Sequence, residues 1–311
     1  MKKPDGITSD DLHGVFSVPP LPRRTNGKRA LDLDAAERVA NHIAAGGITR
    51  FLYGGNAFLH HITLAEYEAL LDWLADFSDD RWAIPSIGPS FGRAMDQACL
   101  LRRHAFPTAM LLPCGDPRDA EGMERGIREI ADTAGIPLIL YIKSEDAFGG
   151  HVERGLDAIG RLVKDGVGVS IKYAIVRNDP SRDAYLDGLL KRVDRSRVVS
   201  GMGERPAIVH LRDFGLNGMT TGSGCIAPRR CNELLAACDE KRWPDAEAIR
   251  ARFMPLEDQR DAWGPAPVLH HATELAGIAP TGPIPPYVSG LDSKKIEEVR
   301  PVARALREFE G

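Results

Sequence analysis

The sequence has no stretch of about 18 or more apolar residues, the length that a membrane-spanning helix needs. Its first residues, MKKPDGITSDD, include two lysines but neither the apolar core nor the cleavage site of a signal peptide. Cysteine is scarce, and its five positions form no CxxC pair or metal-like spacing: Cys99, Cys114, Cys225, Cys231 and Cys238. These absences argue against a disulfide framework and favour a cytoplasmic protein with reduced thiols.

Excess charge of one sign is also missing. The net charge is −4, and 43% hydrophobic and 27% charged residues are ordinary for a folded domain. We therefore expect no nucleic-acid partner and no membrane partner. No Gly-x-Gly-x-x-Gly motif follows the first predicted strand, and no His/Asp/Glu cluster has metal spacing. The pairs His60-His61 and His270-His271 are adjacent, so on a helix they make poor joint ligands. We expect no dinucleotide, metal or other cofactor.

One pattern repeats along the chain: a short apolar run rich in β-branched residues, a turn, and an amphipathic helical stretch. The runs begin roughly 20 to 35 residues apart, the length of a βα unit. Eight units of this kind predict a (β/α)₈ TIM barrel of the α/β class. An open doubly wound sheet shows the same alternation, but the missing dinucleotide motif counts against it. The predicted strands are Val15–Val18, Arg50–Tyr53, Trp82–Ile87, Thr108–Leu112, Pro137–Tyr141, Val167–Lys172, Arg197–Ser200 and Gly218–Thr221.

Helix signals complete this architecture. Asp34-Ala-Ala-Glu37 and Thr63-Leu-Ala-Glu66 both have the form of a capping box. From about Pro228 the pattern is purely helical, so we assign residues 1–227 to the barrel and 228–311 to its last helix and a C-terminal helical extension. A Pro/Gly-rich break at Gly277–Gly290 separates the last two of the predicted helices, which are Arg229–Lys241, Asp245–Trp263, Pro267–Leu275 and Ser293–Phe309.

Two side chains at predicted strand ends stand out because active sites of such barrels lie at the C-terminal ends of the strands. Lys172 ends the sixth run and Tyr141 ends the fifth, so in a barrel they are near neighbours on the rim. A buried lysine has a lowered pKa and can attack a carbonyl as a free amine, while a nearby phenol can move protons. Alternatively, Lys172 is a strand-end lysine that extends to water, and Tyr141 is a half-buried aromatic.

Two glycine-containing loops could bind an anion. Tyr53-Gly54-Gly55-Asn56 follows the second strand, where glycines let backbone N–H groups approach a carboxylate, although a tight turn without a ligand is the commoner explanation. Thr220-Thr221-Gly222-Ser223-Gly224 follows the last strand. Thr220 and Thr221 are candidates for substrate contact there, and the position also suits a phosphate site.

Further motifs follow one another, in a fixed order, along nearly the whole chain. They are Tyr53-Gly54-Gly55-Asn56 with Leu64 and Glu66, Ile84–Gly88, Ile136–Tyr141, Val169–Lys172, Ser200-Gly201, Gly218–Ser223, Phe253–Leu256 and Pro265–Pro267. In this order they resemble the dihydrodipicolinate synthase / N-acetylneuraminate lyase superfamily.

The resemblance implies a barrel with a C-terminal helical extension, assembled as a homo-oligomer, either a dimer or a tetramer. It places the Schiff-base lysine at Lys172 and the acid/base tyrosine at Tyr141. It also places substrate contacts at Gly201 and in the loop after the second strand, where Gly54, Gly55 and Asn56 would bind the carboxylate of a 2-oxo acid, largely through backbone N–H groups.

The departures from this family are informative. The loop after the second strand lacks the hydroxyl group of the family's proton relay, unless Tyr53 supplies it. Cys114-Gly115 stands where the synthases have tyrosines, and the stretch Ile142–Asp146 lacks the arginine that would grip a second substrate carboxylate. Lys143, Glu145 and Asp146 in that stretch are candidates for selecting a second substrate. These changes argue against a true dihydrodipicolinate synthase.

The sequence therefore predicts a class I lyase that acts on pyruvate or a 2-oxo-3-deoxy sugar acid, as an aldolase or a dehydratase. Both reactions pass through the same enamine, so the sequence does not choose between them. Two alternatives stay open: a catalytically silent barrel that binds a 2-oxo acid, and a phosphate-handling barrel enzyme without Schiff-base chemistry.

Overall fold

The computed structural model describes residues 6–25 and 28–311. Its strands form one parallel sheet in the order β3-β2-β1-β9-β8-β7-β6-β5-β4. The strands are β1 (Gly14–Ser17), β2 (Arg50–Leu52), β3 (Trp82–Ile84), β4 (Ser86–Ile87), β5 (Ala109–Leu111), β6 (Leu138–Ile142), β7 (Gly168–Tyr173), β8 (Val198–Ser200) and β9 (Gly218–Thr221).

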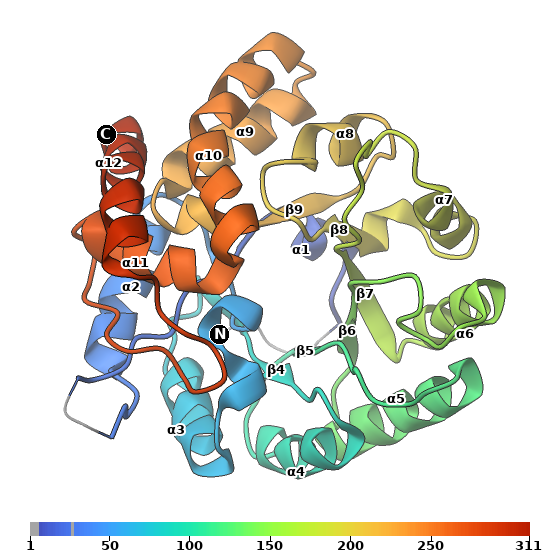
Figure 1. Cartoon of the computed structure of the whole chain (residues 1–311). Coiled ribbons are helices and arrows are strands. Elements are labelled where there is room, and N and C mark those ends of the chain that lie inside the picture. The colour runs from blue at the N-terminus through green and yellow to red at the C-terminus, as the bar shows by residue number, and fades with distance from the viewer. Residues whose placement is uncertain (1–5, 26–27) are drawn as a thin grey trace.

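The sheet closes on itself because β3 and β4 are two parts of one extended run, interrupted at Pro85, which has no N–H to donate. One side of this run pairs with β2, and the Tyr53 N–H donates to the Ile84 carbonyl (3.0 Å). The other side pairs with β5, and the Met110 N–H donates to the Pro85 carbonyl (2.9 Å). The nine labelled strands are therefore the eight predicted ones, and the predicted (β/α)₈ barrel is confirmed. Figure 1 shows the ring of strands with helices around it.

Helices separate successive strands and cover the outside of the barrel (Figure 1). None of the helices in the described parts of the chain is long and apolar enough to cross a membrane. They are α1 (Ser9–Leu12), α2 (Leu33–Ala45), α3 (Leu64–Ala75), α4 (Phe91–Leu101), α5 (Ala120–Ala134), α6 (Val152–Lys164), α7 (Ala184–Leu190), α8 (Ala207–Arg212), α9 (Pro228–Asp239), α10 (Trp243–Trp263), α11 (Pro265–Leu275) and α12 (Ser293–Glu310), with short 3₁₀ turns η1 (Gly55–Ala57), η2 (Leu59–His61), η3 (Arg195–Arg197) and η4 (Ser223–Cys225).

One of the two predicted capping boxes is present. Thr63 caps α3, with its side chain bonded to the Glu66 N–H and the Glu66 carboxylate bonded back to Thr63. The box predicted at Asp34 is wrong, because α2 starts earlier. Asp32 is its N-cap and accepts from the Ala35 N–H (3.1 Å), which leaves Asp34 in the first turn, where an acidic side chain complements the helix dipole.

The C-terminal helices are attached to the rim of the barrel. Helix α9 packs on β1 and β9, while α10, α11 and α12 pack on one another. Helix α11 also packs on η1, where His270 hydrogen-bonds the Asn56 carbonyl through Nε2 (3.1 Å). The loop after β2 is thus held from outside the barrel by a residue more than 200 positions away in the chain.

Candidate active site

Lys172 and Tyr141 lie side by side at the C-terminal ends of neighbouring strands. They are directly paired in the register of β6 and β7. Because paired residues of adjacent strands point to the same face of a sheet, both side chains enter the mouth of the barrel. The Nζ atom of Lys172 lies 4.2 Å from the centroid of the Tyr141 ring. Lys172 and Tyr141 are therefore neighbours on the rim, as the order of the two predicted strands indicates.

The surroundings of Lys172 favour the uncharged amine. The residue is 5% exposed and lines a small cavity together with Phe16, Leu52, Ile139, Ser170, Val199 and Thr220. Burial, then the positive charges of Lys143 and Arg260, lower the pKa of Lys172 from 10.5 to about 7. Among residues 6–25 and 28–311, the Lys172 amine donates no hydrogen bond and forms no ion pair. A buried, unpaired amine that titrates near neutrality can act as a nucleophile.

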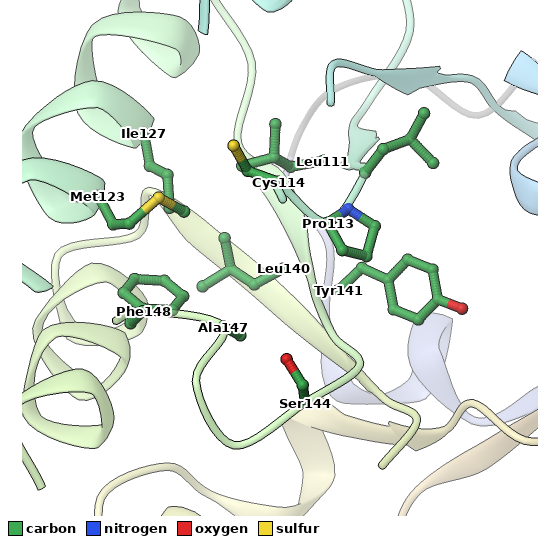
Figure 2. Close-up of a pocket in the computed structure, with 11 residues that line it drawn as sticks. Leu111, Pro113, Cys114, Met123, Ile127, Leu140, Tyr141, Ser144, Ala147 and Phe148 are labelled. Atoms are coloured by element: carbon green, nitrogen blue, oxygen red, sulfur yellow. The ribbon is translucent and has the colours of Figure 1, made fainter. Parts of the chain in front are cut away.

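Tyr141 keeps its proton. Burial raises its pKa to about 12, so the phenol is neutral at pH 7 and can donate a hydrogen bond. Figure 2 shows its ring at the edge of a cleft between β5, β6 and α5. Its hydroxyl points away from the apolar group formed by Met123, Ile127 and Phe148 in that cleft.

The loop after β2 presents free backbone donors. The N–H groups of Gly54, Gly55 and Asn56 have no acceptor in the described parts of the chain. Gly54 also lies in close quarters, since a Cβ atom there would lie 2.8 Å from Met110 Cε and 3.2 Å from Ser86 Oγ, and the Met110 side chain would have to shift. Three successive unpaired N–H groups form a concavity that suits a carboxylate.

The side-chain amide and the backbone carbonyl of Asn56 hold the loop in place. The side-chain Nδ2 of Asn56 donates to the Val18 carbonyl (2.7 Å), and the backbone carbonyl of Asn56 accepts from His270 Nε2. The side chain therefore fixes the loop to the end of β1.

Tyr53, which the sequence offers as a source of the missing relay hydroxyl and as a substrate contact, lies on the outer side of the barrel wall. Leu52 faces the cavity beside Lys172, so alternation along the strand turns Tyr53 outward. Its ring packs edge-on against Trp73 of α3, with centroids 5.6 Å apart, and is fully buried there. The barrel mouth has lost this hydroxyl without a replacement from the same loop.

Gly201 and Thr220 both adjoin the lysine. A Cβ atom on Gly201 would lie 2.8 Å from Lys172 Cγ and 2.7 Å from the Tyr173 carbonyl oxygen, so only glycine leaves room for the lysine stem. Thr220 of β9 faces the same cavity as Lys172. Its hydroxyl has no hydrogen-bond partner among the described residues.

Thr221, the other threonine predicted to contact substrate, points away from the cavity beside Lys172. It follows Thr220 on β9 and therefore faces the helices instead of the cavity. Its hydroxyl donates to the Glu204 carboxylate and accepts from the Gly224 N–H (2.6 Å).

A buried cluster that the sequence did not predict fills the space beside the last loop. Arg260 of α10 is 7% exposed and forms an ion pair with Glu257, which also accepts from the Ser223 hydroxyl. The guanidinium fits because Gly222 has no side chain: a Cβ atom there would lie 2.4 Å from Arg260 Nη2. Burial, then the nearby Glu257 carboxylate, raise the pKa of Glu204 to about 7.

This cluster weakens the phosphate alternative. The hydroxyls of Thr221 and Ser223, which would have to bind a phosphate, donate to the carboxylates of Glu204 and Glu257 instead. A phosphate would also be repelled by the carboxylates at that position. No signal in the sequence linked Arg260 to the site, because it comes from the C-terminal extension, 88 positions after Lys172.

Residues 6–25 and 28–311 contain no group of three or more His, Cys, Asp or Glu side chains that could hold a metal ion. The rings of His60 and His61 lie 6.2 Å apart, centroid to centroid, and His61 also contacts the ring of Tyr287. Burial, then the charges of His61 and Lys143, lower the pKa of His60 to about 4. His60 is therefore a neutral imidazole near the barrel mouth.

Comparison with known proteins supports the same architecture. No family model matches the sequence. The chain is 27% identical over 287 residues to 4-hydroxy-tetrahydrodipicolinate synthase 1 of Streptomyces coelicolor, covering 89% of this chain and 90% of that protein. The solved dihydrodipicolinate synthase of Oceanobacillus iheyensis has a TM-score of 0.79 at 20% identity, covering 95% of this chain and 96% of that one. The enzyme of Bacillus clausii has a TM-score of 0.81 at 18% identity, covering 96% and 98%. At such identities the structural likeness concerns the fold.

Proposed function

The chain is a divergent member of the dihydrodipicolinate synthase / N-acetylneuraminate lyase superfamily, and from this premise we propose that it is a Schiff-base-forming lyase. Its substrate would be pyruvate or a 2-oxo-3-deoxy sugar acid. The observation that supports this most directly is the buried Lys172 amine, 4.2 Å from the centroid of the Tyr141 ring in the barrel mouth.

In the proposed reaction, the free amine of Lys172 attacks the C2 carbonyl carbon and forms a carbinolamine. Loss of water then produces a protonated imine, whose nitrogen accepts the electron pair released when a bond at C3 breaks. Cleavage of C3–C4 is the aldolase reaction. Removal of a C3 proton followed by loss of the C4 hydroxyl is the dehydratase reaction. Both pass through the enamine.

Tyr141 would carry the protons of this sequence. Its neutral phenol can protonate the departing carbinolamine hydroxyl, and the resulting phenolate can take a proton from the substrate. The unpaired N–H groups of Gly54, Gly55 and Asn56 would bind the C1 carboxylate. Gly201 leaves room for the lysine stem, and Thr220 lies beside it.

The test is trapping of the imine. The protein is incubated with pyruvate, reduced with borohydride, and analysed by intact mass and peptide mapping. We expect an adduct at Lys172 that disappears in Lys172→Ala and persists in Lys164→Ala, an exposed lysine at the end of α6. Absence of an adduct with pyruvate and with several sugar-derived 2-oxo acids would remove the proposal.

A second candidate is a catalytically silent barrel that still binds a 2-oxo acid. The outward position of Tyr53 favours it, because the loop after β2 then contributes no relay hydroxyl. Exchange of the pyruvate C3 hydrogens with deuterium from solvent separates the two candidates. A lyase that forms the enamine catalyses this exchange, and a silent binder does not.

A further inference from the structure

The residue after the candidate nucleophile is a buried tyrosine whose hydroxyl is hydrogen-bonded. Lys172 and Tyr173 are the last two residues of β7, so alternation along the strand turns Lys172 into the barrel and Tyr173 to its outer face. Tyr173 is 0% exposed, and its hydroxyl donates to the Asp183 carboxylate (2.5 Å). The end of the strand that bears the candidate nucleophile is therefore held from behind by a side-chain hydrogen bond.

Asp183 is a buried carboxylate with three donors. Its Oδ2 atom accepts from Tyr173, while Oδ1 accepts from Arg177 Nη2 (2.8 Å) and, as the N-cap of α7, from the Leu186 N–H (3.1 Å). Burial by itself would raise the pKa of Asp183, but the hydrogen bonds from Arg177 and Tyr173 hold it below its usual value. Asp183 is therefore ionised at neutral pH, which makes the hydrogen bond from Tyr173 a charge-assisted one.

The same network reaches the loop after the neighbouring strand. Arg177, which follows β7, also forms an ion pair with Glu145 (2.7 Å) in the loop after β6. Glu145 comes four residues after Tyr141. Tyr173 is thus linked to the loop that leaves the strand of Tyr141 through two side chains, those of Asp183 and Arg177. The strands that carry the amine and the phenol are tied together outside the barrel as well as by their backbone ladder.

The backbone ladder around β7 ends directly after Lys172. On one side the Ala174 N–H donates to the Ile142 carbonyl (2.8 Å), and on the other the Gly201 N–H donates to the Tyr173 carbonyl (2.6 Å). Beyond these bonds the chain leaves the sheet. A shift of Tyr173 would also move Gly201, which lies against the stem of Lys172. The side chain of Tyr173 therefore restrains the strand at the point where backbone pairing stops.

Two aromatic rings pack around Tyr173. The ring of Tyr185 in α7 stacks on it with centroids 6.4 Å apart, and His210 of α8 lies edge-on at 5.9 Å. The hydroxyl of Tyr185 is buried without a hydrogen-bond partner among the described residues. The two tyrosines thus share their packing and differ in their hydrogen bonding, so Tyr185 is a matched control for Tyr173.

We propose that Tyr173 and Asp183 are positioning residues of the Schiff-base reaction, whose hydrogen bond fixes the end of β7 and keeps the Lys172 amine against the Tyr141 ring. The inference rests on the proposed function and adds two residues that lie outside the barrel mouth. A misplacement of about 1 Å can slow a reaction by about 10²-fold. Imine formation requires only that the amine reach the carbonyl, whereas proton transfer requires the amine and the phenol in register. Loss of the hydrogen bond should therefore slow proton transfer more than it reduces imine formation.

The test separates positioning from folding by counting active sites. Wild-type protein, Tyr173→Phe and Asp183→Asn are saturated with pyruvate and reduced with borohydride. Intact mass and peptide mapping then give the fraction of chains with an adduct at Lys172. The rate of deuterium incorporation at pyruvate C3 is divided by this fraction. A variant that merely folds less completely loses trapped sites, but each remaining site keeps its rate.

We expect Tyr173→Phe to lower the exchange rate per trapped site by roughly tenfold or more. The pH midpoint of the initial trapping rate should move upward from about 7, because a less restrained Lys172 amine is more accessible to water. Asp183→Asn should produce the same kind of loss. The double variant should lose no more than Asp183→Asn alone, because both changes remove one hydrogen bond. Tyr185→Phe should leave the rate and the midpoint unchanged.

The inference is overturned if Tyr173→Phe exchanges at the wild-type rate per trapped site. It is equally overturned if Tyr185→Phe loses as much as Tyr173→Phe, since the effect would then come from aromatic packing. Trapping of pyruvate in either case leaves the proposed Schiff-base function intact. If the wild-type protein traps neither pyruvate nor any sugar-derived 2-oxo acid, the proposed function fails first, and Tyr173 and Asp183 have no imine to position.

Discussion

Replacing the candidate nucleophile should make the protein more stable. Lys172 is 5% exposed, and its pKa falls from 10.5 to about 7 on folding. At pH 7 the unfolded chain therefore holds a proton that about half of the folded molecules have released. By the linkage between proton binding and folding, the lower pKa of Lys172 in the folded state reduces the free energy of unfolding at pH 7 by an amount on the order of 4 kcal/mol. Lys172→Met keeps an unbranched side chain that is one atom shorter and removes the titrating amine.

The sign of the effect depends on pH in a definite way. Below about pH 7 the full cost is present, because the amine is charged in both states. Between pH 7 and 10.5 the cost shrinks, because the folded-state amine is already neutral and removing the proton from the unfolded-state amine requires less free energy as the pH approaches 10.5. We expect Lys172→Met to raise the free energy of unfolding by a few kcal/mol at pH 7, with the gain vanishing above pH 10.5. Urea titrations at several pH values measure this.

Lys164→Met is the matched control, since Lys164 is exposed at the end of α6 and should change stability by less than about 0.5 kcal/mol. Two results would refute the reasoning. One is a Lys172→Met variant that is less stable than the wild type at pH 7. The other is a gain that does not change with pH, because the stabilisation would then come from packing and not from the removed titration.

Three further predictions concern the reaction. Tyr141→Phe should still form the imine but slow deuterium incorporation at pyruvate C3 by roughly 10²-fold, the scale of a positioned acid/base; unchanged exchange by NMR would remove Tyr141 from the mechanism. The initial rate of trapping should rise with pH, with a midpoint at about pH 7. Lys143→Met should shift this midpoint upward, because one of the charges that lower the pKa of Lys172 is gone. A midpoint near pH 10 in the wild type would contradict a buried amine. Gly201→Ala should fold, as judged by circular dichroism, yet lose most of its trapping, because the new Cβ atom would lie 2.8 Å from Lys172 Cγ; full trapping would show that the lysine stem has room to move.

The barrel itself could be predicted from the sequence because it depends on local pattern. Each of the eight predicted apolar runs forms a strand, and the run Trp82–Ile87 is divided only where Pro85 cannot donate. The proximity of Lys172 and Tyr141 followed from the same pattern, because consecutive strands of a barrel are neighbours. The capping box at Thr63 is equally local, since all of its atoms lie within one turn.

Side-chain direction at the rim was harder to predict. Tyr53 and Thr221 stand one residue beyond Leu52 and Thr220, which face the cavity, and this single step turns them to the outer face. Strand boundaries in a sequence are uncertain by more than one residue, and a shift of one residue reverses the side on which a side chain lies.

The sequence by itself therefore determined the repeating βα units, the order of the strands and the adjacency of an amine and a phenol at two neighbouring strand ends. Only the tertiary structure decided which charges remain free around them. Glu145 and Asp146 are neutralised by Arg177 and Arg118, which follow other strands, while Lys143 two positions earlier in the chain has no such partner among the described residues. Arg260 reaches the site from the C-terminal extension. The physical reason is that ion pairing and burial depend on distances in space between distant segments, and local sequence pattern carries no information about those distances.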